Sequence, residues 1–220
     1  MADPESERVT PVTAEQWLTA ADRGVEANAR LTGSIAAVLL VLLAAEGLTI
    51  LRIFPLIKWH VFLGMVLVPP VLLKIGSTSY RFMRYYAGSP AYRRKGPPLP
   101  LFRLLGPFVI VLSVIVLASG IALLFDTSAR GTLLFVHRAS FVLWFGAMTI
   151  HVLGHFLETA RLAPRDYYWR TRRQVAGANL RQWSLAASLA IGVLLGLLLA
   201  GRVVPFLAGF SVHLAVRFAS

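Results

Sequence analysis

The segment Thr132–Glu158, TLLFVHRASFVLWFGAMTIHVLGHFLE, decides the fold expected for this chain. It is longer than the roughly 20 residues that a membrane-spanning helix needs, and it carries His137, His151 and His155. Ionisable side chains inside a membrane span mark functional sites by default. His137 and His151 are 14 residues apart, which in an α-helix separates them by about 21 Å along the axis and roughly 40° in direction. Two imidazoles stacked on one helix face suit two planar cofactors, one above the other.

The composition indicates an all-α integral membrane protein with little mass outside the bilayer. Of the 220 residues, 57% are apolar and 15% are charged, and the mean hydropathy is +0.68. Each of five apolar runs has about the length of a membrane span. We expect spans at Leu31–Ile53, Ile57–Ser77, Leu101–Phe125, Thr132–Glu158 and Trp183–Leu207.

The charge pattern predicts the topology. The net charge of +12 comes from basic residues beside apolar segments, which is typical of membrane topology rather than of nucleic-acid binding. Basic residues crowd the segments Tyr80–Leu104 and Arg161–Arg181, and Asp166 is the single acidic residue in the two. The positive-inside rule therefore predicts a multi-pass plasma-membrane protein with a cytoplasmic N-terminus and an external C-terminus.

The flanking segments divide the chain further. Residues 1–30 form a cytoplasmic lead-in, either solvated or containing an amphipathic helix with Trp17, Leu18, Ala21 and Val25 on one face. Residues 159–182 form a basic cytoplasmic loop, and residues 208–220 form a short external tail that contains His213. No cleaved signal is expected, because the first apolar run begins near Leu31 behind an acidic stretch. The absence of cysteine excludes disulfides, iron–sulfur clusters held by thiolates and Cys-attached haem.

A weak internal repeat predicts two paired helical hairpins. The first span ends LLAAEGLTIL and the third ends VLASGIALLF, so Glu46-Gly47 aligns with Ser119-Gly120. The next span of each hairpin then begins with a histidine, His60 or His137. Both histidines are expected near the external side, at equal depth, in helices that run the same way.

His60 and His137 are the predicted axial ligands of a buried haem. Imidazoles from two facing helices can hold haem iron in an electron-transfer protein. Arg52, Lys58 and Arg138 are expected at the same level, where they can pair with haem propionates. Gly47, Gly64, Gly120 and Ser140 would let the macrocycle approach the backbone. The alternative is that both histidines are interfacial residues bonded to water or to carbonyl groups.

The second, deeper position is less symmetrical. His151 is a provisional ligand of a second haem, but the equivalent position in the second span is Lys74, whose ammonium has no lone pair for iron. Three outcomes are open: Lys74 extends to the cytoplasmic interface without a second haem, His151 or His155 uses another partner, or neutral Lys74 is itself a ligand. His151 and His155 also form an i, i+4 pair, a weak indication of a zinc or non-haem iron site.

Glu46 is expected to relay protons or bind a quinol, or to bond Thr49 or Arg52.

The last span carries Ser188, Gly192, Gly196 and Ala200 at every fourth position. Such a stripe of small residues favours close helix packing, either within the chain or in a homodimer.

The histidines, the Ser119-Gly120 pair and the basic loops together resemble the bacterial membrane b-type cytochromes. That superfamily includes cytochrome b561-like proteins and the cytochrome b-subunits of hydrogenase and formate dehydrogenase. The resemblance covers about Leu31–Glu158 and implies a four-helix haem-binding bundle, up-and-down, with the fifth span outside it. It also implies electron transfer between quinone and a partner redox subunit, with His60 and His137 binding one haem b and His151 binding a second. Lys74 departs from the pattern, because a histidine is expected there.

The sequence supports two alternative functions. The first is a membrane electron-transfer cytochrome, more a subunit than a self-contained enzyme, since no Gly-rich nucleotide-binding fingerprint is present. The second is a membrane transporter or scaffold subunit that handles metal or protons through His151, His155 and Glu46.

Overall fold

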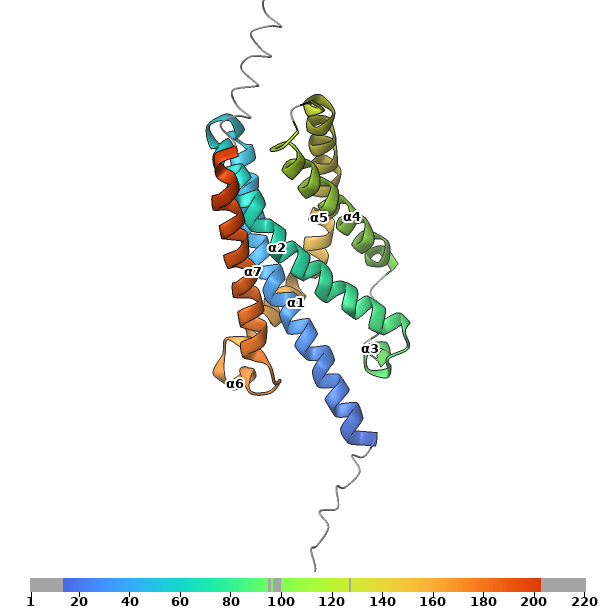
Figure 1. Ribbon diagram of the computed structural model, residues 1–220. Helices are drawn as coiled ribbons and strands as arrows, with labels where there is room; N and C mark the ends of the chain where they lie inside the picture. The colour runs from blue at the N-terminus through green and yellow to red at the C-terminus, as the bar shows by residue number, and fades with distance from the viewer. Residues whose placement is uncertain (1–13, 95, 97–99, 127, 203–220) are drawn as a thin grey trace, which may run out of the picture.

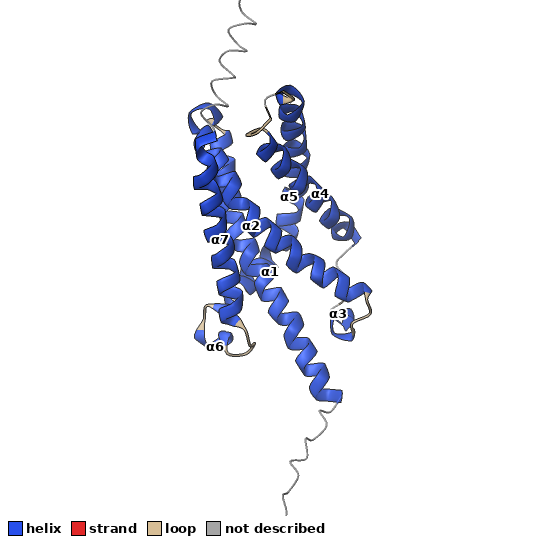
Figure 2. Ribbon diagram, viewed as in Figure 1, coloured by secondary structure: helices blue, strands red, loops and turns tan. Residues whose placement is uncertain are grey.

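The computed structural model describes residues 14–94, 96, 100–126 and 128–202, and within them the chain is helical without a strand (Figure 2). The long helices are α1 (Ala14–Ile50), α2 (Ile53–Tyr86), α4 (Pro100–Ala122), α5 (Arg130–Leu162) and α7 (Ala178–Leu199). Short helices are α3 (Pro90–Arg94), α6 (Trp169–Arg172), η1 (Ala163–Asp166) and η2 (Ala200–Arg202). Each long helix contains a stretch long and apolar enough to cross a membrane. The predicted all-α, five-span membrane architecture is therefore confirmed.

Three of the helices run well past the predicted spans. Helices α1, α2 and α5 have 37, 34 and 33 residues, against the roughly 20 that cross a bilayer. Residues 14–30, the expected site of a separate amphipathic helix, continue α1 instead. Val25 is buried there against Tyr85, Ala91 and Tyr92. Residues 203–207 of the last predicted span, and His213, lie outside the described residues.

Four helices form a bundle in which each contacts two neighbours. Helix α1 packs on α2, α2 on α4, α4 on α5, and α5 on α1 (Figure 1). Helices α2 and α5 therefore lie diagonally across the bundle, which places residues on their inner faces opposite each other. The Asp126 turn precedes α5: Asp126 Oδ1 accepts hydrogen bonds from the Ser128 hydroxyl at 2.6 Å and from the Ser128 backbone N–H at 2.8 Å. These bonds, the hydroxyl's foremost, hold the pKa of the Asp126 carboxyl below its usual range.

Helix α7 packs outside the bundle, along α2. A Cβ added at Gly192 would lie 2.5 Å from the Val66 carbonyl oxygen, and one added at Gly196 would lie 2.7 Å from Phe62 Cδ2. Ser188, on the same stripe, is buried. The small-residue stripe is thus used for close packing within the chain, where glycine lets the α7 and α2 backbones approach.

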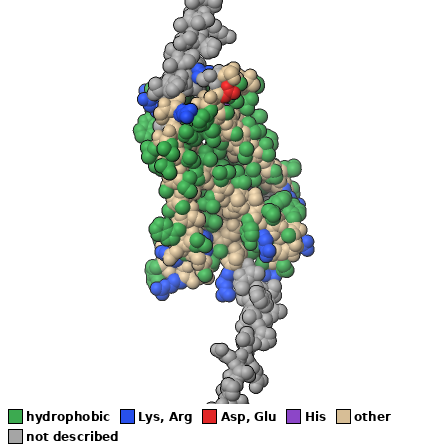
Figure 3. Space-filling model, in the orientation of Figure 1, with side chains coloured by type: hydrophobic (Ala, Val, Ile, Leu, Met, Phe, Trp, Pro, Cys, Tyr) green, Lys and Arg blue, Asp and Glu red, His purple; other side chains and the backbone are tan. Residues whose placement is uncertain are grey.

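A buried ionic cluster ties α7 to the rest of the molecule at the end that carries α3 and α6, called the basic end below. Arg181 donates to both carboxylate oxygens of Asp166, at 2.5 and 2.7 Å. Arg30 of α1 lies 3.4 Å from Asp166 Oδ1 and donates to the Thr171 carbonyl at 2.8 Å. Arg30 and Asp166 are 1% and 2% exposed. On the outside, hydrophobic side chains cover the middle of the molecule, and lysines and arginines gather toward the ends (Figure 3).

Candidate functional site

His60 and His137 face each other across the bundle. His60 lies near the start of α2 and His137 near the start of α5, so both lie close to the end of the molecule opposite the basic end. Their ring centroids are 6.3 Å apart and the ring planes are nearly perpendicular, at 82°. Both rings are partly buried. The pairing predicted from the repeat is thus present as a spatial pair.

This spacing fits a metal ion between the rings. A histidine nitrogen binds a metal at about 2 Å, and the centre of an imidazole ring lies about 1 Å further back. Two imidazoles on opposite sides of one iron therefore have centroids about 6 Å apart. The 6.3 Å separation of His60 and His137 agrees with that arrangement.

His60 is held through its Nδ1 atom by two residues of α1. Nδ1 lies 2.9 Å from Glu46 Oε1 and 2.9 Å from Thr49 Oγ1. The Thr49 hydroxyl donates its own proton to the Glu46 carbonyl oxygen at 2.6 Å, so it accepts from His60. We therefore assign the proton of His60 to Nδ1, which leaves the Nε2 lone pair available for a metal.

His137 is held in the same way by α4. Its Nδ1 donates to the Val116 carbonyl oxygen at 3.0 Å and lies 3.2 Å from Ser119 Oγ. The Ser119 hydroxyl donates to the Ile115 carbonyl at 2.7 Å. A carbonyl can only accept, which places the proton on Nδ1 of this ring too. Metal-binding histidines are commonly oriented by a hydrogen bond of this kind from the other ring nitrogen.

The internal repeat explains this matched arrangement. Glu46 and Ser119, which align in the repeat, each contact the histidine of their own hairpin. Gly120 lies against His137, since a Cβ there would come within 3.1 Å of ring atom Cε1. The sequence placed Glu46 near this site but did not identify His60 as its partner. The alignment of Glu46 with Ser119 in the repeat was the signal that could have indicated this contact.

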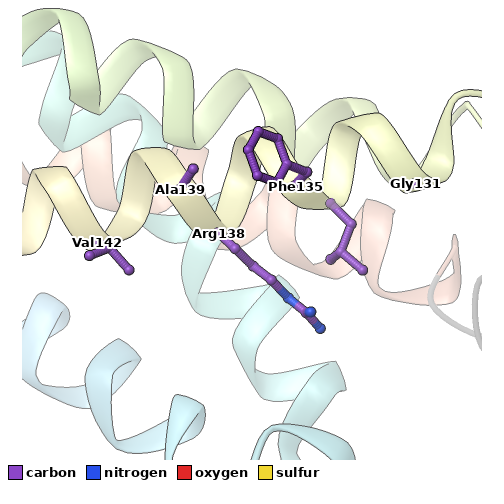
Figure 4. Close-up of a pocket in the computed structure, with 6 residues that line it drawn as sticks. Gly131, Phe135, Arg138, Ala139 and Val142 are labelled. Atoms are coloured by element: carbon purple, nitrogen blue, oxygen red, sulfur yellow. The ribbon is translucent and has the colours of Figure 1, made fainter.

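The three predicted basic residues lie at the same end as the histidine pair. Arg138 lines a groove of about 390 Å³ on one face of α5. Figure 4 shows its side chain extending away from the α5 ribbon. Arg52 stands at the α1–α2 turn and Lys58 in the first turns of α2, and all three are exposed. Their positions therefore suit contacts with carboxylates at the edge of the bundle.

The deeper residues form a different group. The Lys74 ammonium donates to the Thr32 carbonyl oxygen of α1 at 2.9 Å. The rings of His151 and His155 are 4.8 Å apart, and His155 Nδ1 lies 3.4 Å from Glu158 Oε2. Nδ1 of His151 is buried without a hydrogen-bond partner in the described chain. Unlike His137, His151 is thus not held by a bond at Nδ1.

No cluster of three or more metal-ligating side chains forms among the described residues. Within that part of the chain, His151 and His155 do not gain the third ligand that a zinc or non-haem iron site requires. A haem differs, because the macrocycle supplies four ligands itself and the protein needs to provide only the two axial ones.

No family model, curated protein or solved structure matches this chain.

Proposed function

We propose that this chain is a membrane-bound b-type cytochrome that binds one haem between His60 and His137 and transfers electrons. The observation that carries the proposal is the pair of imidazoles 6.3 Å apart, each held at Nδ1 by its own hairpin. When bound, haem supplies a one-electron carrier inside the bilayer.

The chain's own residues suit that role. The two histidines lie on helices that pack against their neighbours in the bundle, so their positions can stay the same in both oxidation states. Gly120 leaves room beside the His137 ring, and Arg52, Lys58 and Arg138 are available to propionate groups at the bundle edge. Mobile, weakly bonded rings would serve a carrier less well, because they would reorganise at each electron transfer.

The contact of Lys74 supports one haem rather than two. While its ammonium donates to the Thr32 carbonyl, it has no lone pair to offer iron. His151 then has no partner from α2, and its unbonded Nδ1 lacks the orientation that metal-binding histidines receive. The provisional second haem at His151 is therefore left out of the proposal.

The cellular setting completes the proposal. By the positive-inside rule, the basic end faces the cytoplasm of a plasma-membrane protein, and the histidine pair lies toward the external side. An electron carrier at that depth would exchange electrons with quinone in the bilayer and with a partner redox subunit. The chain would then act as a subunit of a redox complex and not as a self-contained enzyme.

A reduced-minus-oxidised visible spectrum of the purified full chain, with haem quantified after extraction, tests the proposal. We expect sharp α and Soret bands and about one haem per chain. A colourless protein after expression with an adequate haem supply would overturn it. Stoichiometric zinc without haem iron would instead favour metal handling by His151 and His155.

A further inference from the structure

We propose that Glu46 is a positioning residue that lowers the reduction potential of the haem through its bond to His60. This inference rests on the proposed function and goes beyond it, because it assigns a tuning role to a residue that does not touch the iron.

The Glu46 carboxylate is directed at His60. Its Oε1 lies 2.9 Å from His60 Nδ1, and the side chains of Glu46 and His60 are 14% and 20% exposed. The other oxygen, Oε2, is buried without a hydrogen-bond partner in the described part of the chain. Among the described residues, His60 is therefore the group that the Glu46 side chain bonds to.

The two histidines differ in the charge of their partners. His60 is bonded by a carboxylate, whereas His137 is bonded by a neutral carbonyl and a neutral hydroxyl. Glu46 and Ser119 occupy aligned positions of the internal repeat, while Thr49 makes a second contact with His60 and the Val116 carbonyl a second contact with His137. The two hairpins thus differ in charge at this aligned position, where Ser119 is neutral.

The physical consequence follows from the chemistry of the imidazole ring. A carboxylate that accepts the Nδ1 proton increases the basicity of the ligating nitrogen. A more basic ligand and a nearby negative charge both stabilise the ferric state over the ferrous state, which has one positive charge fewer. In a site with limited access to water this interaction is weakly screened. Glu46 is thereby expected to lower the midpoint potential.

The test is an equilibrium redox titration of the haem-loaded full chain with the variants Glu46→Gln and Ser119→Ala. Glutamine keeps the size of the side chain and an acceptor oxygen but removes the charge. At a fixed applied potential, we expect Glu46→Gln to raise the ratio of reduced to oxidised haem about tenfold, which is about 59 mV for a one-electron couple. Ser119→Ala should change the ratio less than about twofold, because the Val116 carbonyl still holds His137.

A second variant covers the case in which Glu46→Gln fails to retain haem. Glu46→Asp keeps the carboxylate, so its potential should lie nearer to the wild-type value than that of any neutral variant. A haem-loaded Glu46→Gln protein with an unchanged potential would overturn the inference. A Glu46→Asp protein whose ratio of reduced to oxidised haem rises about tenfold would overturn it too. A wild-type chain without haem would overturn the proposed function itself, and is detected before any variant is titrated.

Discussion

The imidazoles of His60 and His137 lie on helices at diagonal corners of the bundle, with their ring centroids 6.3 Å apart. Neither helix needs to contact the other for this to happen. Each ring is oriented by the helix that precedes its own, α1 for His60 and α4 for His137. The site therefore depends on how the two hairpins are packed, and changes in packing should be visible in haem binding.

A substitution at Gly120 tests how closely this residue packs against the His137 ring. A Cβ at this position would lie 3.1 Å from the ring, so Gly120→Val should push the imidazole away from its bond to Val116. Overpacking of this kind costs about 1–3 kcal/mol, and we expect the haem content of the purified protein to fall several-fold. Gly146→Ala, on α5, is the control because a Cβ there meets nothing within 4 Å. Equal haem content in both variants would contradict the packing assigned to Gly120.

Asp166 tests the buried ionic cluster. Replacement by alanine leaves Arg181 buried without its carboxylate partner, while Arg30 keeps its ion pair with Glu26. Breaking such a pair from one side costs about 3–5 kcal/mol, so Asp166→Ala should lower the thermal unfolding midpoint in detergent markedly.

The matched control for Asp166 is Asp22, which pairs with Arg94 at 2.7 Å while both side chains are about half exposed. An exposed pair contributes only about 0–1 kcal/mol, so Asp22→Ala should have little effect on the unfolding midpoint. If the two variants were destabilised equally, burial would not be what gives the Asp166 cluster its importance.

Gly192 tests the packing of α7 on α2. A side chain there would collide with the Val66 backbone, so Gly192→Leu should destabilise the protein by about 1–3 kcal/mol or separate the two helices. Ala190→Leu adds the same side chain at an exposed position of α7 and should be neutral. The measurement is thermal unfolding together with protease sensitivity of the 163–177 loop. A stable Gly192→Leu protein that forms a new dimer would show that the stripe serves association instead.

His151 tests the number of haems. Because the Lys74 nitrogen is bonded to the Thr32 carbonyl and the proposed haem lies between His60 and His137, His151→Ala should leave the haem-to-protein ratio and the α band unchanged. The ratio is measured by haem extraction alongside protein quantification. A fall to about half of the wild-type ratio would mean that a second haem is bound at His151.

Much of the fold could be predicted because hydrophobic length and charge alone specify it. The five spans, and the pairing of His60 with His137 by equal depth, follow from periodicity and from the repeat. The ends of the helices could not be predicted, since residues 14–30 are polar enough to suggest a separate segment. They join α1 because Val25 and Arg30 find partners in other parts of the chain.

The contacts of single polar side chains could not be predicted from the sequence either. The Glu46–His60 bond depends on the rotation of α1 against α2, and the Lys74–Thr32 bond on a backbone carbonyl of another helix. Neither has a sequence signature. The Arg30–Asp166–Arg181 cluster joins three segments that are distant in the sequence. Its one sequence signal is Asp166, the single acidic residue in the two basic loops.

The most direct test of whether His60 and His137 hold one haem between them is the haem-to-protein ratio of His60→Ala and His137→Ala, each compared with His155→Ala. All three variants remove an imidazole from a membrane helix, so general effects on folding are matched. We expect His60→Ala and His137→Ala each to lose the bis-histidine haem spectrum and most of the bound haem, while His155→Ala keeps both. Full haem binding in His60→Ala or His137→Ala, or loss confined to His155→Ala, would contradict this expectation.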